Sequence, residues 1–153
     1  MNKYPVWLKT AAIFQLIAAI IHSISLFVTL PPNNETEKKL FTLMDTYKFD
    51  LGTGFHRTMG ELTLVFSACF CLICLLGGLL NWYLLRKKVD SEIIKGVITI
   101  NLVVFGILFG LTVAFTFLLP IIQTGLIVLF LILSRFTKRE TTEQFPGDNQ
   151  TAS

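Results

Sequence analysis

Apolar and polar positions divide the chain into long blocks, in which uncharged apolar stretches are separated by polar segments. The clearest stretch runs from Leu62 to Leu85 and contains no charged residue. About 24 residues at ~1.5 Å rise form a helix of about 36 Å, which crosses a hydrocarbon core of ~30 Å with some tilt. The pattern predicts an all-α, four-transmembrane-helix bundle, a single domain over residues 1–136, with spans at about 11–30, 62–85, 93–115 and 120–136.

No charge separates the third and fourth apolar stretches, so their boundary depends on Pro120 and on length. A single helix from Ile93 to Ser134 is about 63 Å long, which exceeds any bilayer. Two helices joined by a tight apolar turn, with Pro120 at the first position of the second helix, satisfy the length limit. The sequence therefore predicts two helices.

A connection of about 30 residues follows the first span, which Pro31 is expected to end. Within it, residues 35–47 carry apolar side chains at helical spacing, and Asn34 is a candidate N-cap before acids in the first turn. These apolar residues are Leu40, Phe41, Met44 and Tyr47. We predict an amphipathic loop helix that lies on the membrane surface or caps the bundle.

Small and polar residues recur every three or four positions in three of the predicted spans. The stripes are Ala11, Gln15, Ala18, His22, Ser25 and Thr29; Gly60, Leu64, Ser67, Cys71, Cys74, Gly78 and Asn81; and Gly96, Thr99, Val103, Gly106, Gly110 and Val113. Small residues let helix backbones approach, and polar residues avoid lipid. We therefore predict that all three stripes face the interior of the bundle, with a close approach at Gly106 and Gly110.

Composition and charge support a membrane protein and give it a direction. Apolar residues make up 53% of the chain and charged residues 15%, which excludes the soluble globular class. Alternate threading places nine lysines and arginines on one side, and on the other only Lys38, Lys39, Lys48 and Arg57. The positive-inside rule then predicts that both termini are cytoplasmic and that the loop helix is extracytoplasmic. We expect a cytoplasmic (inner) membrane protein, and the polar residues 137–153 are expected to form a disordered cytoplasmic tail.

This threading brings scattered polar residues to the outer end of the bundle. The candidate ligand-binding residues are His22, His56, Arg57, Glu61 and Gln123. Ionisable groups at this depth are costly unless paired, which makes them functional candidates. Arg57 is suited to anchor a phosphate or carboxylate, Glu61 to orient Arg57 or exchange protons, and His22 to accept a proton or donate a hydrogen bond.

Structural roles compete with these functional ones. Arg57 and Glu61 also fit an anchoring pair at the start of a helix, and His22 fits a hydrogen bond between helices. The first functional hypothesis is a protein that binds a membrane lipid, a small amphiphile or a membrane protein partner through an outer-leaflet polar pocket. The alternative is a membrane enzyme that acts on a lipid-soluble substrate with His22, Arg57 and Glu61. A transporter is a weaker third class, since one polar cluster on one side provides no continuous pathway.

Other chemistries lack their usual residues. Cys71 and Cys74 have the spacing of membrane thiol oxidases, but these enzymes need a second, exposed cysteine pair, and the sequence has none. We predict that both cysteines are packing residues. No metal site, cofactor or nucleic-acid partner is predicted, because the sequence has no ligand cluster, phosphate-binding glycine loop or aromatic-basic surface.

An ordered set of residues resembles a group of small bacterial four-helix integral membrane proteins with no established activity. The set is His22, Pro31, Met44, Gly54, Arg57, Glu61 and Pro120, and the resemblance covers about residues 10–136. Ile21 stands where that group tends to have glycine. The resemblance implies a membrane location and a four-helix fold, and it implies no reaction.

Overall fold

A computed structural model describes residues 4–28, 31–50, 52, 54–87 and 89–137. These residues form five α-helices and one two-stranded antiparallel sheet. In chain order the elements are α1 (Tyr4–Ser25), α2 (Glu35–Thr46), β1 (Lys48–Asp50), β2 (His56–Thr58), α3 (Met59–Lys87), α4 (Ser91–Phe115) and α5 (Leu118–Phe136). Within the described ranges, α1, α3, α4 and α5 are long and apolar enough to cross a membrane. The predicted fold class is confirmed, and the chain is a multi-pass membrane protein.

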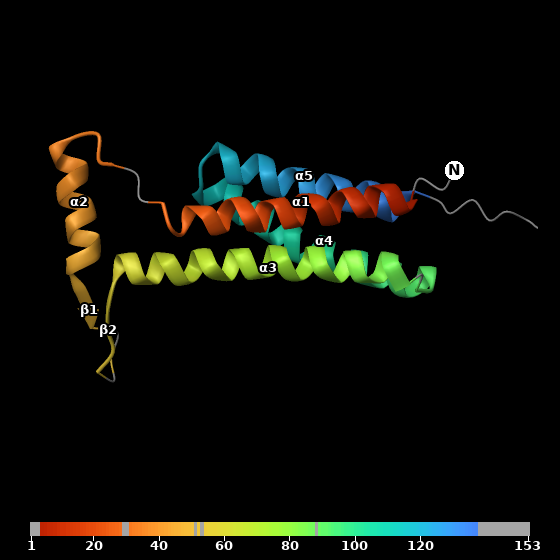
Figure 1. The fold of residues 1–153 in the computed structure, drawn as a ribbon, viewed down its shortest axis with the longest axis horizontal. Coiled ribbons are helices and arrows are strands. Elements are labelled where there is room, and N and C mark those ends of the chain that lie inside the picture. Colours follow the sequence, from red (N-terminus) through yellow and green to blue (C-terminus); the bar gives the residue numbers. More distant parts are fainter. Residues whose placement is uncertain (1–3, 29–30, 51, 53, 88, 138–153) are drawn as a thin grey trace, which may run out of the picture.

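The long helices form a bundle in which α1 lies between α3 and α5 (Figure 1). Helix α4 packs along α5 and has only slight contact with α3. We call the end that carries α2 and the strands the hairpin end. We call the opposite end the basic end, because it carries Lys9, Arg86, Lys87, Lys95 and Arg135.

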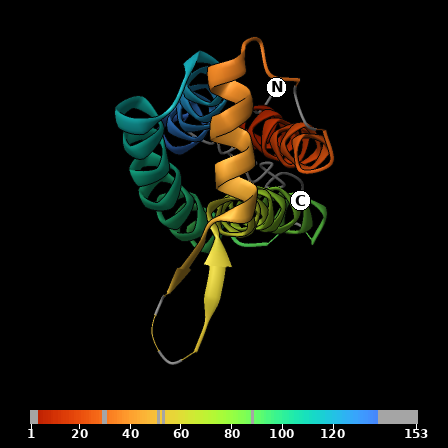
Figure 2. The same ribbon diagram turned by 90° about the vertical axis from the view of Figure 1, so that its left-hand side faces the viewer.

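Helix α2 lies across the hairpin end, at a steep angle to the long helices (Figure 2). The side chain of Asn34 accepts a hydrogen bond from the backbone N–H of Glu37 at 2.8 Å, which confirms Asn34 as the N-cap. No residue of α2 is buried. The loop helix is therefore present as predicted and lies outside the packed core.

The core contains side chains from all four long helices, and most of them are small or aliphatic. Its buried members include Leu8, Ala11, Ala18, Cys74, Ile98, Phe105, Ile127 and Leu131. Gly78 of α3 lies against α1 so closely that a Cβ there would be 2.8 Å from Leu16 Cγ and 3.1 Å from the Ala12 carbonyl oxygen. Small residues therefore set the close α1–α3 contact, as their spacing predicts.

The prediction for the third span is wrong: the glycine stripe of α4 faces outward. A Cβ at Gly96, Gly106 or Gly110 would meet no atom within 4 Å. The buried residues of α4 are instead Ile94, Ile98, Asn101, Phe105 and Thr112. They begin two residues before the glycine stripe, about 200° around the helix. Burial of the larger side chains and the amide explains this orientation, because lipid can cover glycine but cannot pair an amide.

The helix boundaries differ from the predicted spans, most of all in α1. Helix α1 covers Tyr4–Ser25 and not residues 11–30, because Leu26 and Phe27 donate to carbonyls three residues back and close the helix before Pro31. Helices α4 and α5 are separate, with Pro120 at the third residue of α5. Thr29 and the predicted tail beyond Thr137 lie outside the described residues.

A short β-ribbon between α2 and α3 has no counterpart in the sequence prediction. In the register, Phe49 pairs with Arg57 and Asp50 pairs with His56. The carboxylate of Asp50 accepts a hydrogen bond from Gly52 N–H at 2.9 Å, and Gly52 has a φ of 80°. Because glycine adopts positive φ readily, this residue allows the chain to turn back toward α3.

Candidate functional site

Arg57 and Glu61 lie where β2 leads directly into α3. The backbone N–H of Thr58 donates to Glu61 Oε2 at 2.9 Å, and the N–H of Glu61 donates to Thr58 Oγ1 at 3.2 Å. These reciprocal bonds form a capping box, which satisfies two backbone donors at the start of the helix. Glu61 therefore has a structural role, with one of its two oxygens engaged.

Arg57 keeps its hydrogen-bonding capacity. Its Nη1 lies 3.7 Å from Glu61 Oε1, an ion pair that is longer than a hydrogen bond, and the two side chains are 53% and 51% exposed. Within the described part of the chain, the Arg57 guanidinium makes no hydrogen bond. Its fork of N–H donors is available to a ligand.

His56 precedes Arg57 in β2 and is exposed. Successive side chains of a strand point to opposite faces, so His56 and Arg57 do not face one ligand from the same side of the ribbon. His56 and Arg57 are therefore neighbours in sequence, but they do not contribute to one binding site.

His22 lies farther along the bundle. Its ring packs against Phe70 of α3, with ring centroids 4.6 Å apart. Phe70 follows Glu61 by nine residues in the same helix, about 14 Å along the axis. His22 therefore does not contact the Arg57–Glu61 pair.

Gln123 of α5 lies on another face. It lines a hollow of about 170 Å³ between α1 and α5, whose other lining residues are all apolar: Phe14, Ile17, Ile21, Leu119, Ile122 and Leu126. Of the five candidate residues, the structure thus brings only Arg57 and Glu61 into contact. The other three lie apart from this pair: His56 is on the other face of the ribbon, His22 packs against Phe70, and Gln123 lines the hollow between α1 and α5.

The sequence prediction missed a buried cluster of three amides. Asn81 Nδ2 donates to Gln15 Oε1 at 2.9 Å, and Asn101 Nδ2 lies 3.4 Å from Asn81 Oδ1. All three residues are buried, and Gln15 Nε2 has no hydrogen-bond partner. The signal in the sequence was polar amides inside apolar spans. Their convergence depends on how α1, α3 and α4 are rotated, which spacing alone does not give.

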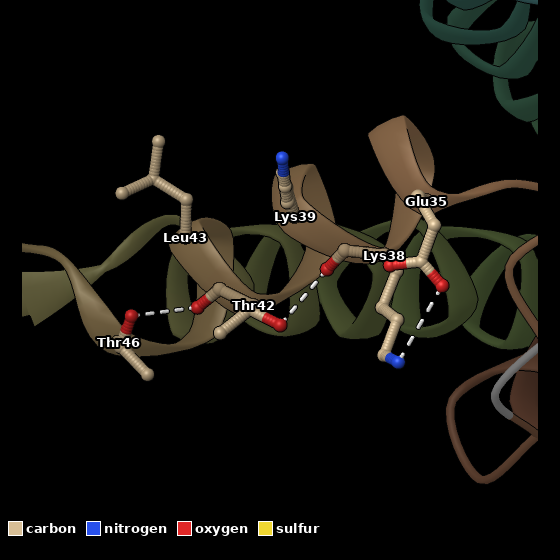
Figure 3. Close-up of a pocket in the computed structure, with 6 residues that line it drawn as sticks. All are labelled: Glu35, Lys38, Lys39, Thr42, Leu43 and Thr46. Atoms are coloured by element: carbon tan, nitrogen blue, oxygen red, sulfur yellow. Dashed lines mark hydrogen bonds and ion pairs between the residues drawn. The ribbon is translucent and has the colours of Figure 1, made fainter.

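A shallow hollow of about 280 Å³ lies along one face of α2, and Figure 3 shows the side chains that line it. Its lining comes from this helix alone: Glu35, Lys38, Lys39, Thr42, Leu43 and Thr46. Lys38 pairs with Glu35 at 3.7 Å, and Thr42 and Thr46 donate to carbonyls one turn earlier. Four of the six lining side chains are thus paired within this exposed helix, and no second described element contributes a group to the hollow.

The described residues contain no group of three or more His, Cys, Asp or Glu side chains placed to hold a metal ion. Cys71 and Cys74 are buried free thiols, and Cys71 Sγ lies 3.4 Å from Ser23 Oγ on α1. Comparison of the chain with models of known families, with curated proteins and with solved structures finds no match.

Proposed function

We propose that this protein is an inner membrane protein that binds the acidic head group of a lipid or other amphiphile at its hairpin end. Both termini are cytoplasmic and the hairpin end is extracytoplasmic. The excess of lysine and arginine at the basic end supports this orientation, because cytoplasmic loops carry most of the basic residues.

Arg57 is the contact that carries the proposal. It lies half-exposed at the point where α3 enters its apolar stretch, which is the depth of lipid head groups. Its single ion pair is long, and its remaining donors match a phosphate or carboxylate in a two-bond arrangement. A partly paired arginine at an interface is thus suited to hold an acidic head group.

Apolar side chains at the same end suit the rest of an amphiphile. The connection between α4 and α5 exposes large apolar residues, and so does the chain after α1: Phe115, Phe117, Leu118 and Phe27. Helix α2, at the same end, exposes Leu40 and Leu43, and its C-cap residue Tyr47 is also exposed. A cation beside uncovered apolar surface fits a ligand with a charged head and an apolar tail.

The geometry supports binding better than catalysis. The enzyme alternative needs His22, Arg57 and Glu61 around one substrate, but Phe70, which His22 contacts, lies about 14 Å along α3 from Glu61. General acid–base catalysis requires groups within hydrogen-bond reach of the same reacting atoms. One oxygen of Glu61 is also engaged by the helix cap.

Lipid analysis tests the binding proposal. The full chain, purified in a mild detergent, is compared with Arg57→Gln and with Lys48→Gln, which removes a charge from the same ribbon one strand away. We expect the wild-type protein and Lys48→Gln to retain an acidic amphiphile by native mass spectrometry, and Arg57→Gln to lose most of it. Equal retention in all three proteins would contradict the assignment of Arg57.

Cysteine labelling tests the orientation. Thr36 lies on α2 and is exposed. In a cysteine-free background, we expect Thr36→Cys to react with a membrane-impermeant maleimide added to intact cells. Reaction only after the membrane is permeabilised would reverse the proposed threading.

A further inference from the structure

A hollow of about 580 Å³ lies at the basic end, on the opposite side of the bundle from Arg57. It opens between the start of α4 and the end of α5. Its lining residues are Ser91, Glu92, Lys95, Gly96, Thr99 and Arg135. Most of these are polar, although they adjoin two helices that cross the membrane.

Two cations from different helices face this hollow. Arg135 Nε of α5 donates to Thr99 Oγ1 of α4 at 3.2 Å, which fixes the guanidinium and leaves its terminal nitrogens for another partner. Lys95 lies one turn before Thr99 on α4. Across the described residues, no carboxylate lies within 4 Å of Lys95 or Arg135. Glu92 also lines the hollow, so its charged side chains sum to a net positive charge.

The helix backbone adds to this positive potential. The hollow includes the first residues of α4, where the helix dipole favours an anion, and the Asp90 carboxylate already accepts a hydrogen bond from the Glu92 N–H at 2.9 Å. A Cβ at Gly96 would meet no atom within 4 Å, so the space beside this glycine is open. These features strengthen a site that the two side chains define.

The surface of α4 beyond the hollow is apolar and uncovered. Ile100, Val103 and Ile107 are 64%, 58% and 63% exposed, and they continue from the hollow toward the middle of the span. An acyl chain packs well against such a surface. The polar hollow and the apolar strip are therefore arranged like the head and tail of a lipid.

We infer that this hollow binds the phosphate of an anionic phospholipid, with Lys95 and Arg135 as its ligands and the acyl chains along α4. Net positive charge favours a lipid with net negative charge over a zwitterionic one, because the added cation of a zwitterionic head group is repelled. The adjoining apolar strip favours a lipid over free phosphate. This site is independent of Arg57, which lies at the other end of the bundle.

Native mass spectrometry of the full chain in mild detergent tests the inference. Phosphatidylglycerol and phosphatidylcholine with identical acyl chains are titrated separately. We expect tighter binding of phosphatidylglycerol, and roughly a 30-fold weaker affinity when Lys95→Gln and Arg135→Gln are combined, since each cation near an anionic lipid contributes several-fold. Lys87→Gln is the matched control. Lys87 lies at the same end, over the Tyr83 ring and outside the hollow, so its loss should change affinity less than twofold.

A second variant separates lipid binding from folding. Gly96→Leu keeps both cations and fills open space, so it should weaken phosphatidylglycerol binding without lowering thermal stability. Equal affinity for the two lipids, wild-type affinity in Gly96→Leu, or an equal loss in Lys87→Gln would overturn the inference. Full displacement of phosphatidylglycerol by inorganic phosphate would identify a free-anion site and would also overturn it.

Discussion

Gly78→Ala should loosen the contact between α1 and α3. The added Cβ would lie 2.8 Å and 2.9 Å from two Leu16 side-chain carbons and 3.1 Å from the Ala12 carbonyl oxygen. The leucine side chain can rotate, but the carbonyl belongs to the backbone of α1. The two helices must therefore separate by a few tenths of an ångström along their shared face.

The size of the effect follows from two opposing terms. Overpacking of a well-filled contact costs about 1–3 kcal/mol. Replacement of glycine by alanine within a helix stabilises the folded state by up to ~1 kcal/mol through the higher helix propensity of alanine. We expect a net loss of about 1–2 kcal/mol in the free energy of unfolding.

Gly110→Ala is the matched control, because the same substitution in α4 places its Cβ in open space. The free energy of unfolding is measured for both variants by titration with sodium dodecyl sulfate in mixed micelles. Gly110→Ala should equal or slightly exceed the wild-type protein. Equal stability of the two variants would refute the packing argument, and greater destabilisation by Gly110→Ala would show that the glycine face of α4 is packed.

Four further substitutions, one of them a control, probe the hydrogen bonds. Asn81→Ala breaks the amide cluster and leaves Gln15 Oε1 without its donor, so the free energy of unfolding in the same micelles should fall by about 1–2 kcal/mol. Thr58→Ala removes the cap of α3 and should cost about 1 kcal/mol, whereas Thr63→Ala, which loses an exposed bond within the helix, should cost less than half as much. Asn34→Ala should speed amide hydrogen exchange in α2 without changing global stability, because no residue of that helix is buried.

Much of the fold follows from the sequence because length and charge limit the choices. A charge-free stretch such as Leu62–Leu85 must be helical in lipid, where every backbone group needs a partner. The two-helix interpretation around Pro120 rested on length alone and is confirmed. The cap at Asn34 is a local interaction, since its hydrogen bond joins residues three apart in sequence. Such an interaction can be predicted without knowledge of the tertiary structure.

The rotation of each helix was harder to predict. In α4 both faces are apolar, so the periodicity that marks the buried side of a soluble helix carries little information. Glycines at Gly106 and Gly110 suggested an interior face, but the amide of Asn101 decided the orientation. A buried amide gains a partner only inside the bundle, whereas glycine loses little in lipid.

The candidate site shows the same division between local and distant information. Arg57 and Glu61 are four residues apart, and their pairing follows from spacing even though Arg57 belongs to a strand. The capping box formed by Thr58 and Glu61 also has a sequence signal, a threonine followed three residues later by a glutamate. The location of His22 depended on which face of α1 meets α3, and no spacing rule gives that.

The amide cluster explains how α3 and α4 stay associated although they share little packing. In a membrane, the hydrophobic effect does not favour contact between helices over contact with lipid, because lipid tails are as apolar as the side chains. Asn81 bonds to Gln15 of α1 and contacts Asn101 of α4, so one residue fixes α3 against both helices. Gly77 permits this approach, since a Cβ there would lie 2.7 Å from Gln15 Nε2 and 3.2 Å from Asn101 Oδ1. The bundle is thus held by packing of α1 on both α3 and α5 and of α4 on α5, while the amides add a direct link between α3 and α4.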